Sequence, residues 1–267
     1  MTQVTTTVDF TAQGKQIGWL RAPHSVTRSA YGVVPIPIAV FNNGDGPRIL
    51  LTAGNHGDEY EGQVVLARLI QQLQPHDIRG RLIVIPSLNT PAAIAGTRVS
   101  PLDGGNLNRA FPGDPNGGPT WKIADYLHNH LVPIVDVVCD FHGGGGSLVY
   151  RPHASTHFSP DCSPQLKERS LAAVAALGLR HVMIIESASG GGALSTATRH
   201  HEKIYLNGEY GGMGALTLEG IELVDSAVQR LLAFFGATSR RFEPLPPPQA
   251  LRVLSPRAYV YAPEGGL

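Results

Sequence analysis

Four short apolar runs alternate with amphipathic segments along the middle of the chain. The runs are rich in Val, Ile and Leu and cover residues 48–54, 81–88, 135–141 and 181–187. Continuous apolar runs of this length are typical of strands that are buried on both faces. They therefore predict the strands of a central sheet.

Between these runs, apolar residues recur at steps of three and four, which is helical spacing. One of these segments has clear end signals: Ser163 is a typical N-cap, Pro164 suits the first helical position, and Gly178 follows the end. The segment with Ile221, Val224 and Val228 is closed by Gly236 in the same way. We expect helices over residues 61–73, 120–131, 164–177 and 221–235.

The remaining segments have weaker patterns. We expect a few short strands in residues 1–45, a long loop over 90–119, a glycine-rich irregular stretch over 188–216, and a linker at PLPPP, residues 244–248. Alternating strands and helices predict a three-layer α/β domain with a mixed, mostly parallel sheet. We place this domain at residues 1–243 and expect residues 244–267 to be the linker and an incomplete β-rich segment.

Composition narrows the class of partner. The 267 residues carry 21 basic and 21 acidic side chains, so the formal net charge is zero. A nucleic-acid or acidic-membrane partner normally requires a basic excess, and no apolar run reaches the roughly 20 residues of a membrane span. The first residues lack the basic and apolar regions of a leader peptide. We expect a cytoplasmic protein without a disulfide framework, with Cys139 as a core residue.

Polar residues follow two of the predicted strands. The segment NHGDE, with His56 and Glu59, comes directly after residues 48–54, and DFHGGGG, with His142, ends the run 135–141. The carboxyl ends of neighbouring parallel strands meet at one edge of a sheet, where ligands bind. Two histidines and one carboxylate, with a fourth position open for water, form a known zinc hydrolase arrangement.

Ordinary structural roles are the alternative for each of these residues. His56 also suits a turn, His142 a loop, and Glu59 the first turn of a helix, where the dipole favours an acid. Their common position at strand ends, beside glycines, favours the metal site. Asp140 is then a plausible partner for the ring of a ligand histidine.

The other histidines give weaker signals. The segment HHEKIY is not the zinc motif HExxH, so surface or structural roles are favoured for all of them: His128, His130, His153, His157, His200 and His201.

Three motifs together resemble the succinylglutamate desuccinylase/aspartoacylase family, which is related to zinc carboxypeptidases. They are NHGDEYEG, NLNRAFPG and DFHGG, and the resemblance covers roughly residues 35–236. The segment GNHGDEYEGQ is most similar to the branch of N-acetyl-2,4-diaminobutyrate deacetylases. The resemblance implies a carboxypeptidase-like fold, one Zn²⁺ per chain on the three ligands above, and hydrolysis of a small N-acyl amino acid.

The family pattern also implies the rest of the site. An Asn-Arg pair that holds the substrate carboxylate maps onto Asn108 and Arg109, and an earlier loop arginine that polarises the scissile carbonyl maps onto Arg98. The chemistry agrees, because Arg binds carboxylates in a planar, bidentate way and a cation stabilises a developing oxyanion. Solvated loop arginines are the alternative.

A late glutamate acts as general base in this family. Glu209, in the glycine-rich segment NGEYGGMG, is favoured over Glu186, which ends a predicted strand. A diaminobutyrate substrate also needs an acid near its side-chain ammonium, and Asp103 and Asp114 lie in the substrate loop.

Two other functions remain open: a metallocarboxypeptidase that acts on small peptides, and a non-catalytic protein that binds metal or metabolite on the same scaffold. Related enzymes commonly carry a C-terminal β-domain that shapes the pocket, and residues 251–267 predict only its first strands. A homo-oligomer that covers this edge is compatible with the pattern.

Overall fold

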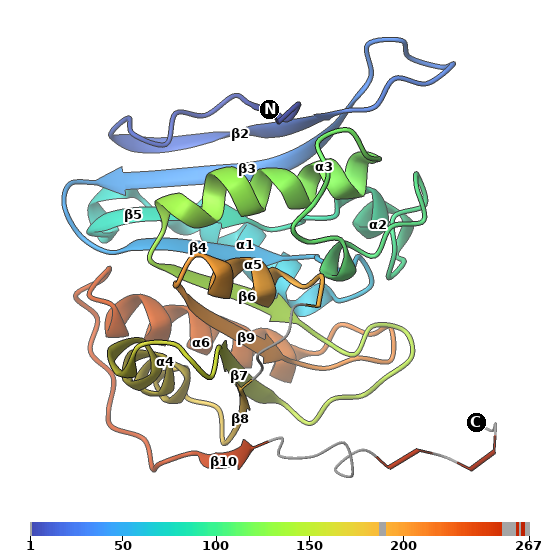
Figure 1. The fold of residues 1–267 in the computed structure, drawn as a ribbon. Coiled ribbons are helices and arrows are strands. Elements are labelled where there is room, and N and C mark those ends of the chain that lie inside the picture. The colour runs from blue at the N-terminus through green and yellow to red at the C-terminus, as the bar shows by residue number, and fades with distance from the viewer. Residues whose placement is uncertain (1, 187–190, 253–259, 262, 265–267) are drawn as a thin grey trace.

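A ten-stranded sheet forms the centre of the molecule (Figure 1). The computed structural model describes residues 2–186, 191–252, 260–261 and 263–264. The strands are β1 (Thr5–Thr6), β2 (Gly14–Pro23), β3 (Val33–Asn43), β4 (Arg48–Ala53), β5 (Gly80–Ile85), β6 (Val137–His142), β7 (His153–Phe158), β8 (His181–Glu186), β9 (Ile204–Glu209) and β10 (Gln249–Arg252). Their order is β1-β2-β3-β5-β4-β6-β9-β7-β8-β10. Five of the nine pairings between described strands are parallel, which confirms the predicted mixed sheet.

Helices cover both faces of this sheet and complete the three layers (Figure 1). One apolar core lies under α1 (Tyr60–Gln72), α4 (Pro164–Ala176) and α6 (Leu218–Phe234). A second core lies under α3 (Pro119–Tyr126), its π-helical continuation η3 (Leu127–Leu131) and α5 (Leu194–His200). Shorter helical turns are η1 (Pro75–Asp77), α2 (Thr90–Ala95), η2 (Leu107–Arg109) and η4 (Val132–Ile134). No helix among the described residues is both long and apolar enough to cross a membrane.

The strongest sequence patterns predicted the right elements. The four apolar runs form β4, β5, β6 and β8, although residue 187 lies outside the described residues. Ser163 caps α4 by accepting a hydrogen bond from the backbone nitrogen of Leu166 at 3.2 Å, and Gly178 follows with a left-handed φ of 84°. The last helix begins three residues earlier than predicted, at Leu218. Cys139 is fully buried in the core.

The prediction of short strands near the N-terminus is wrong. β2 and β3 form one long antiparallel hairpin of 10 and 11 residues. Pro35 and Pro37 make β3 hard to recognise as one long strand in the sequence. Proline lacks a backbone donor, so it is not expected in a strand that pairs on both sides. Both prolines face only β2, since the pairing of β3 with β5 begins at Ala39.

Two segments predicted as irregular contain regular structure. The stretch 188–216 holds α5 and the central strand β9, and the loop 90–119 holds α2 and the turn η2. Strand β7, which is parallel to β8 and antiparallel to β9, was also missed. Within the segment 244–267, β10 pairs in parallel with β8, and most of the remaining tail lies outside the described residues. The domain boundary at residue 244 therefore stays a prediction.

Parallel pairing brings the site residues to one edge. β4 pairs with β6, and β6 pairs with β9, all running in the same direction. Their last residues are therefore neighbours: Ala53 lies opposite Phe141, and His142 lies opposite Glu209. This register places the segment after β4 and the ends of β6 and β9 around one point.

Candidate active site

Three buried side chains converge at this sheet edge. His56 follows β4 after a turn at Gly54, whose φ of 66° is readily adopted by glycine. Glu59 precedes the first residue of α1, and His142 ends β6. The Nδ1 atoms of His56 and His142 lie 2.7 Å from the two different carboxylate oxygens of Glu59. Their exposed fractions are only 3–5%.

Each histidine is oriented by a partner on its other nitrogen. The Nε2 of His142 lies 2.8 Å from a carboxylate oxygen of Asp140, as predicted, and the Nε2 of His56 lies 3.2 Å from the amide oxygen of Asn106. These oxygens are acceptors, so they favour a proton on Nε2 and leave the Nδ1 lone pair directed toward Glu59. No motif predicted this role for Asn106.

Asp140 is itself held by two donors. It is fully buried, Thr52 donates its hydroxyl to one carboxylate oxygen at 2.7 Å, and Asn55 donates its amide to the other at 3.0 Å. Both donors come from β4 and the residues just after it. The neighbouring strand therefore fixes the carboxylate that orients His142.

Charge is strongly coupled across this cluster. Burial raises the pKa of Glu59, but the adjacent imidazoles of His142 and His56 bring it down to about 2. Burial lowers the pKa of His142, yet Asp140 and Glu59 together hold it well above its ordinary value. The cluster thus favours positive charge between its carboxylates, which either a proton or a bound cation can supply.

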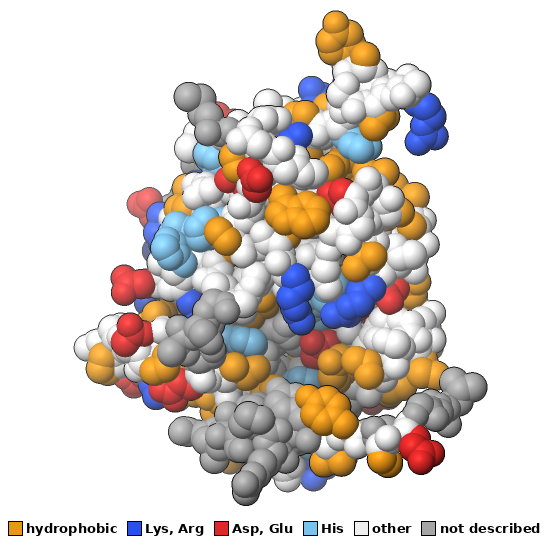
Figure 2. Space-filling model, turned by 45° about the vertical axis from the view of Figure 1, so that its right-hand side comes forward, with side chains coloured by type: hydrophobic (Ala, Val, Ile, Leu, Met, Phe, Trp, Pro, Cys, Tyr) orange, Lys and Arg blue, Asp and Glu red, His pale blue; other side chains and the backbone are white. Residues whose placement is uncertain are grey.

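A small cavity of about 150 Å³ opens beside the three residues. Its lining contains the three predicted metal ligands, the three predicted loop residues and Glu209, together with Gly143, Leu148 and Tyr150, to which no motif assigned a role. In Figure 2, basic side chains lie next to acidic and histidine side chains in the middle of the face shown. The cavity therefore combines cationic, anionic and imidazole groups.

The three predicted loop residues reach this cavity from one side. A guanidinium nitrogen of Arg98 lies 3.3 Å from Glu59, while its side chain remains 45% exposed. The amide oxygen of Asn108 accepts a hydrogen bond from the backbone nitrogen of Leu194 at 3.1 Å, which turns its amide donors in the opposite direction. Arg109 is exposed and donates to the carbonyl of Asn108 at 2.7 Å.

The structure separates the two glutamates considered as general base. Glu209 lines the cavity at the end of β9, and one of its carboxylate oxygens is buried without a hydrogen-bond partner. Burial raises the pKa of Glu209 to about 8, and Glu59 adds to the rise while His142 opposes it. Glu186 lies on the surface in an ion pair with Lys167 at 3.3 Å.

The two loop aspartates do not line the cavity. Asp103 accepts hydrogen bonds from both the backbone nitrogen and the hydroxyl of Thr120, at 2.8 and 2.7 Å. Asp114 accepts from the backbone nitrogen of Asn116 at 2.8 Å. Both carboxylates therefore stabilise the conformation of the loop over residues 90–119.

The molecule is a three-layer α/β domain with a charged cavity at one sheet edge, and comparison with known proteins gives its family. The sequence model of the succinylglutamate desuccinylase/aspartoacylase catalytic domain matches residues 45–235. The chain belongs to this family, which confirms the resemblance drawn from its motifs. Members act on N-acyl amide bonds, and this chain is a hydrolase of that kind.

Three relatives cover nearly the whole chain. The N-alpha-acetyl-L-2,4-diaminobutyric acid deacetylase of Halomonas elongata is 41% identical over 99% of this chain and 77% of its own length. The product-bound ectoine utilization protein of Ruegeria pomeroyi is 35% identical, with a TM-score of 0.92, over 98% of this chain and 79% of that one. A succinylglutamate desuccinylase from Silicibacter is 36% identical, with a TM-score of 0.90, over 98% and 78%.

Proposed function

We propose that this chain is a zinc-dependent deacetylase that cleaves N-alpha-acetyl-L-2,4-diaminobutyrate or a close analogue in the cytoplasm. One observation carries the metal part of this proposal: two oriented imidazoles present Nδ1 to the same buried carboxylate. The donor atoms of His56, Glu59 and His142 lie within 4.8 Å of one another.

The donor set fits zinc. Two neutral imidazoles and one carboxylate suit a borderline cation and leave a fourth position for water or substrate. When bound, the zinc ion supplies Lewis acidity that polarises a carbonyl and lowers the pKa of a water molecule. The cavity beside the three residues provides the open side that a catalytic site needs.

Glu209 is the proposed proton carrier. A cation on the neighbouring triad would lower the raised pKa of Glu209 and so favour its ionised form. The unpartnered carboxylate oxygen then takes a proton from the attacking water as the water oxygen bonds to the acetyl carbon. Arg98 stabilises the negative charge that develops on the carbonyl oxygen. The C–N bond then breaks, Glu209 returns the proton to the leaving amine, and acetate and the free amino acid result.

Asn108 and Arg109 are the proposed clamp for the substrate carboxylate. The Leu194 backbone fixes the Asn108 amide oxygen, so the amide hydrogens remain for an incoming anion. The exposed guanidinium of Arg109 lies beside them in the same cavity lining. An arginine and an amide together match the two oxygens of a carboxylate.

The acetyl group and the amine are proposed from the relatives. The protein from Halomonas elongata is named for the acetyl-diaminobutyrate reaction, and the solved relative from Ruegeria pomeroyi is named for ectoine utilization. Sequence identities of 35–41% over almost the full chain support the same substrate class here.

A substrate panel tests this proposal. Zinc-loaded protein is assayed for amine release from N-alpha-acetyl-L-2,4-diaminobutyrate, N-acetyl-aspartate, N-succinyl-glutamate and a dipeptide. We expect the highest kcat/KM for the first compound. Preference for the succinyl compound contradicts the acetyl assignment, and preference for the dipeptide supports a carboxypeptidase instead.

A further inference from the structure

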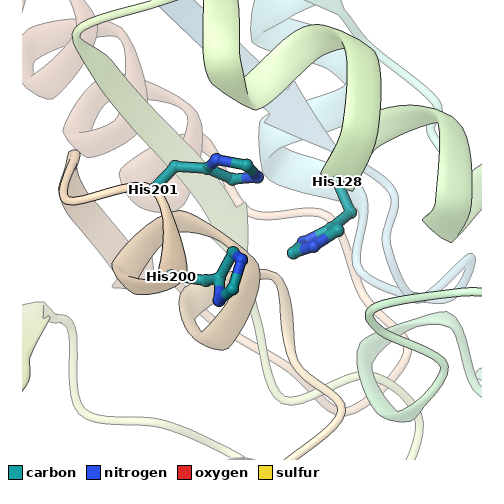
Figure 3. Close-up of side chains that lie close together, drawn as sticks. All are labelled: His128, His200 and His201. Carbon is teal, nitrogen blue, oxygen red and sulfur yellow. The ribbon is translucent and has the colours of Figure 1, made fainter.

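A second cluster of histidines lies away from the cavity. His128 comes from η3, His200 ends α5, and His201 follows it. Figure 3 shows the three rings turned toward a common space between the two helices. The ring centroids of His128 lie 5.0 Å from His200 and 4.8 Å from His201. Aromatic packing alone explains the distances between the rings. It does not explain why two of the ring nitrogens are buried without a hydrogen-bond partner.

Two ring nitrogens in this cluster lack the partners that buried polar atoms normally have. The Nδ1 of His128 and the Nε2 of His201 are shielded from solvent and form no hydrogen bond to any described residue. A buried nitrogen without a partner destabilises the folded chain, because it has lost its hydrogen bonds to water. A single cation bound to both nitrogens removes this cost.

We propose that His128, His200 and His201 form a second metal site, separate from the active site, for a borderline divalent cation such as Zn²⁺, Ni²⁺ or Cu²⁺. Among the described residues, this group and the active-site group are the two that bring three metal-binding side chains together. The two groups share no residue, so each site has its own three ligands.

The geometry requires small side-chain adjustments. One ligand atom from each histidine lies within 4.8 Å of the others. Tetrahedral zinc with Zn–N bonds of 2.0–2.1 Å places its nitrogens about 3.4 Å apart. His200 is exposed, so its ring is free to rotate toward the other two, and water can reach the cluster from that side.

Ligand chemistry selects the class of metal. Three imidazoles without a carboxylate suit zinc, nickel and copper, whereas magnesium and calcium require oxygen ligands. Imidazole binds a metal ion through the lone pair of its neutral form.

The site would fasten one end of α5. A bound ion joins the C-terminal end of this helix to η3, against which α5 packs. The other end of α5 begins at Leu194, whose backbone nitrogen holds the amide of Asn108 in the substrate loop. No group of the cluster lines the active-site cavity, so we assign the second ion a stabilising role in the fold and none in the reaction.

Metal counting with matched variants tests the proposal. Chelator-stripped full-length protein is titrated with Zn²⁺, and bound metal is measured by elemental analysis and calorimetry. We expect two ions per wild-type chain, one for His200→Ala, and two for His130→Ala. His130 is the matched control because it lies two residues after His128 in η3 and its ring stacks on Tyr126 instead. Loss of a residue that only hydrogen-bonds to a metal ligand lowers metal affinity roughly 10- to 100-fold. Loss of a ligand itself, as in His200→Ala, should lower the affinity of the second site by at least this factor.

A second background isolates the cluster from the proposed active site. In the His142→Ala variant we expect one ion, which disappears in His142→Ala/His200→Ala and persists in His142→Ala/His130→Ala. Copper bound to His142→Ala should show electron paramagnetic resonance coupling to several nitrogens. One ion in wild-type protein that is unaffected by His200→Ala, or two ions in His200→Ala, would overturn the proposal. If only the ion that depends on His142 is absent, the proposed active-site metal is contradicted, and the ion that depends on His200 still supports the second site.

Discussion

The two histidine clusters of this chain differ in what surrounds them. At the sheet edge, Glu59 lies between His56 and His142, and acceptors orient both outer ring nitrogens. At the helix pair, three imidazoles meet without a carboxylate among them, and two ring nitrogens have no partner among the described residues.

This difference is the one expected between a catalytic metal site and a structural metal site. Partners on the outer nitrogens fix the tautomer and direction of each ligand, and they raise metal affinity. The sheet-edge cluster also has Glu209 and Arg98 around the same cavity. We propose that Glu209 transfers protons there and that Arg98 stabilises negative charge. The helix-pair cluster has neither of these. We expect the variants below to affect the two clusters separately.

The largest effect is expected at Glu209. Glu209→Gln removes the proton carrier while keeping its shape, so kcat should fall by roughly 10²–10⁴-fold, the usual contribution of general acid–base catalysis. Metal content should stay unchanged. The matched control is Glu186→Gln, which only breaks a surface pair with Lys167 and should retain wild-type kcat. Equal turnover by the two variants would assign the base to another residue.

A smaller effect is expected at the residue behind His142. Asp140→Asn removes the carboxylate that orients the ring, and zinc affinity at the active site should fall roughly 10- to 100-fold. Asp136→Asn is the control, because Asp136 precedes the same strand and instead pairs with Arg48. Calorimetric titration measures both. Unchanged affinity in Asp140→Asn contradicts the proposed orienting role.

The proposed carboxylate clamp should act mainly on substrate binding. Arg109→Ala should raise KM about tenfold or more, since hydrogen bonds to charged groups contribute about 1.5–3 kcal/mol. Arg21→Ala, an exposed arginine on β2, should leave KM unchanged. Steady-state kinetics with the substrate and with its carboxamide sharpen the test, because the carboxamide should lose affinity only for the wild type. A kcat loss with constant KM assigns Arg109 elsewhere.

The smallest effect on activity is expected at the helix-pair cluster. His200→Ala should hydrolyse substrate at the wild-type rate, but zinc should no longer stabilise it through the second site. A ligand at 100 times its Kd stabilises the folded state by about 2.7 kcal/mol. Thermal unfolding of His142→Ala with and without zinc, compared with His142→Ala/His200→Ala, reads out this difference. Equal zinc-induced shifts in both proteins contradict a metal at the cluster.

The active-site region was largely predictable because its signals are local. Apolar runs that end in NHGDE and DFHGG place His56 and His142 at strand ends, and parallel pairing then brings them together. Asn106 was not predictable as the partner of His56, since it lies 50 residues away and only tertiary packing brings it there. The histidine pair at 200–201 likewise meets His128 only through the packing of α5 beside η3.

The missed strands also have physical reasons. β9 has only Ile204, Tyr205 and Leu206 as an apolar run, and the polar Asn207 and Glu209 that follow resemble a loop. Burial in the centre of the sheet, between β6 and β7, holds it as a strand despite this short signal. β7 has the sequence HASTHF and contains no apolar run. Its pairing with β9 helps to hold it as a strand.

Zinc titration of chelator-stripped protein tests the central claim most directly. We predict that activity toward N-alpha-acetyl-L-2,4-diaminobutyrate is lost on stripping and returns with zinc. Wild type and His200→Ala should recover to the same rate, while His142→Ala should not recover. Full activity in protein shown by elemental analysis to contain no metal would contradict the assignment of His56, Glu59 and His142 as the catalytic metal ligands.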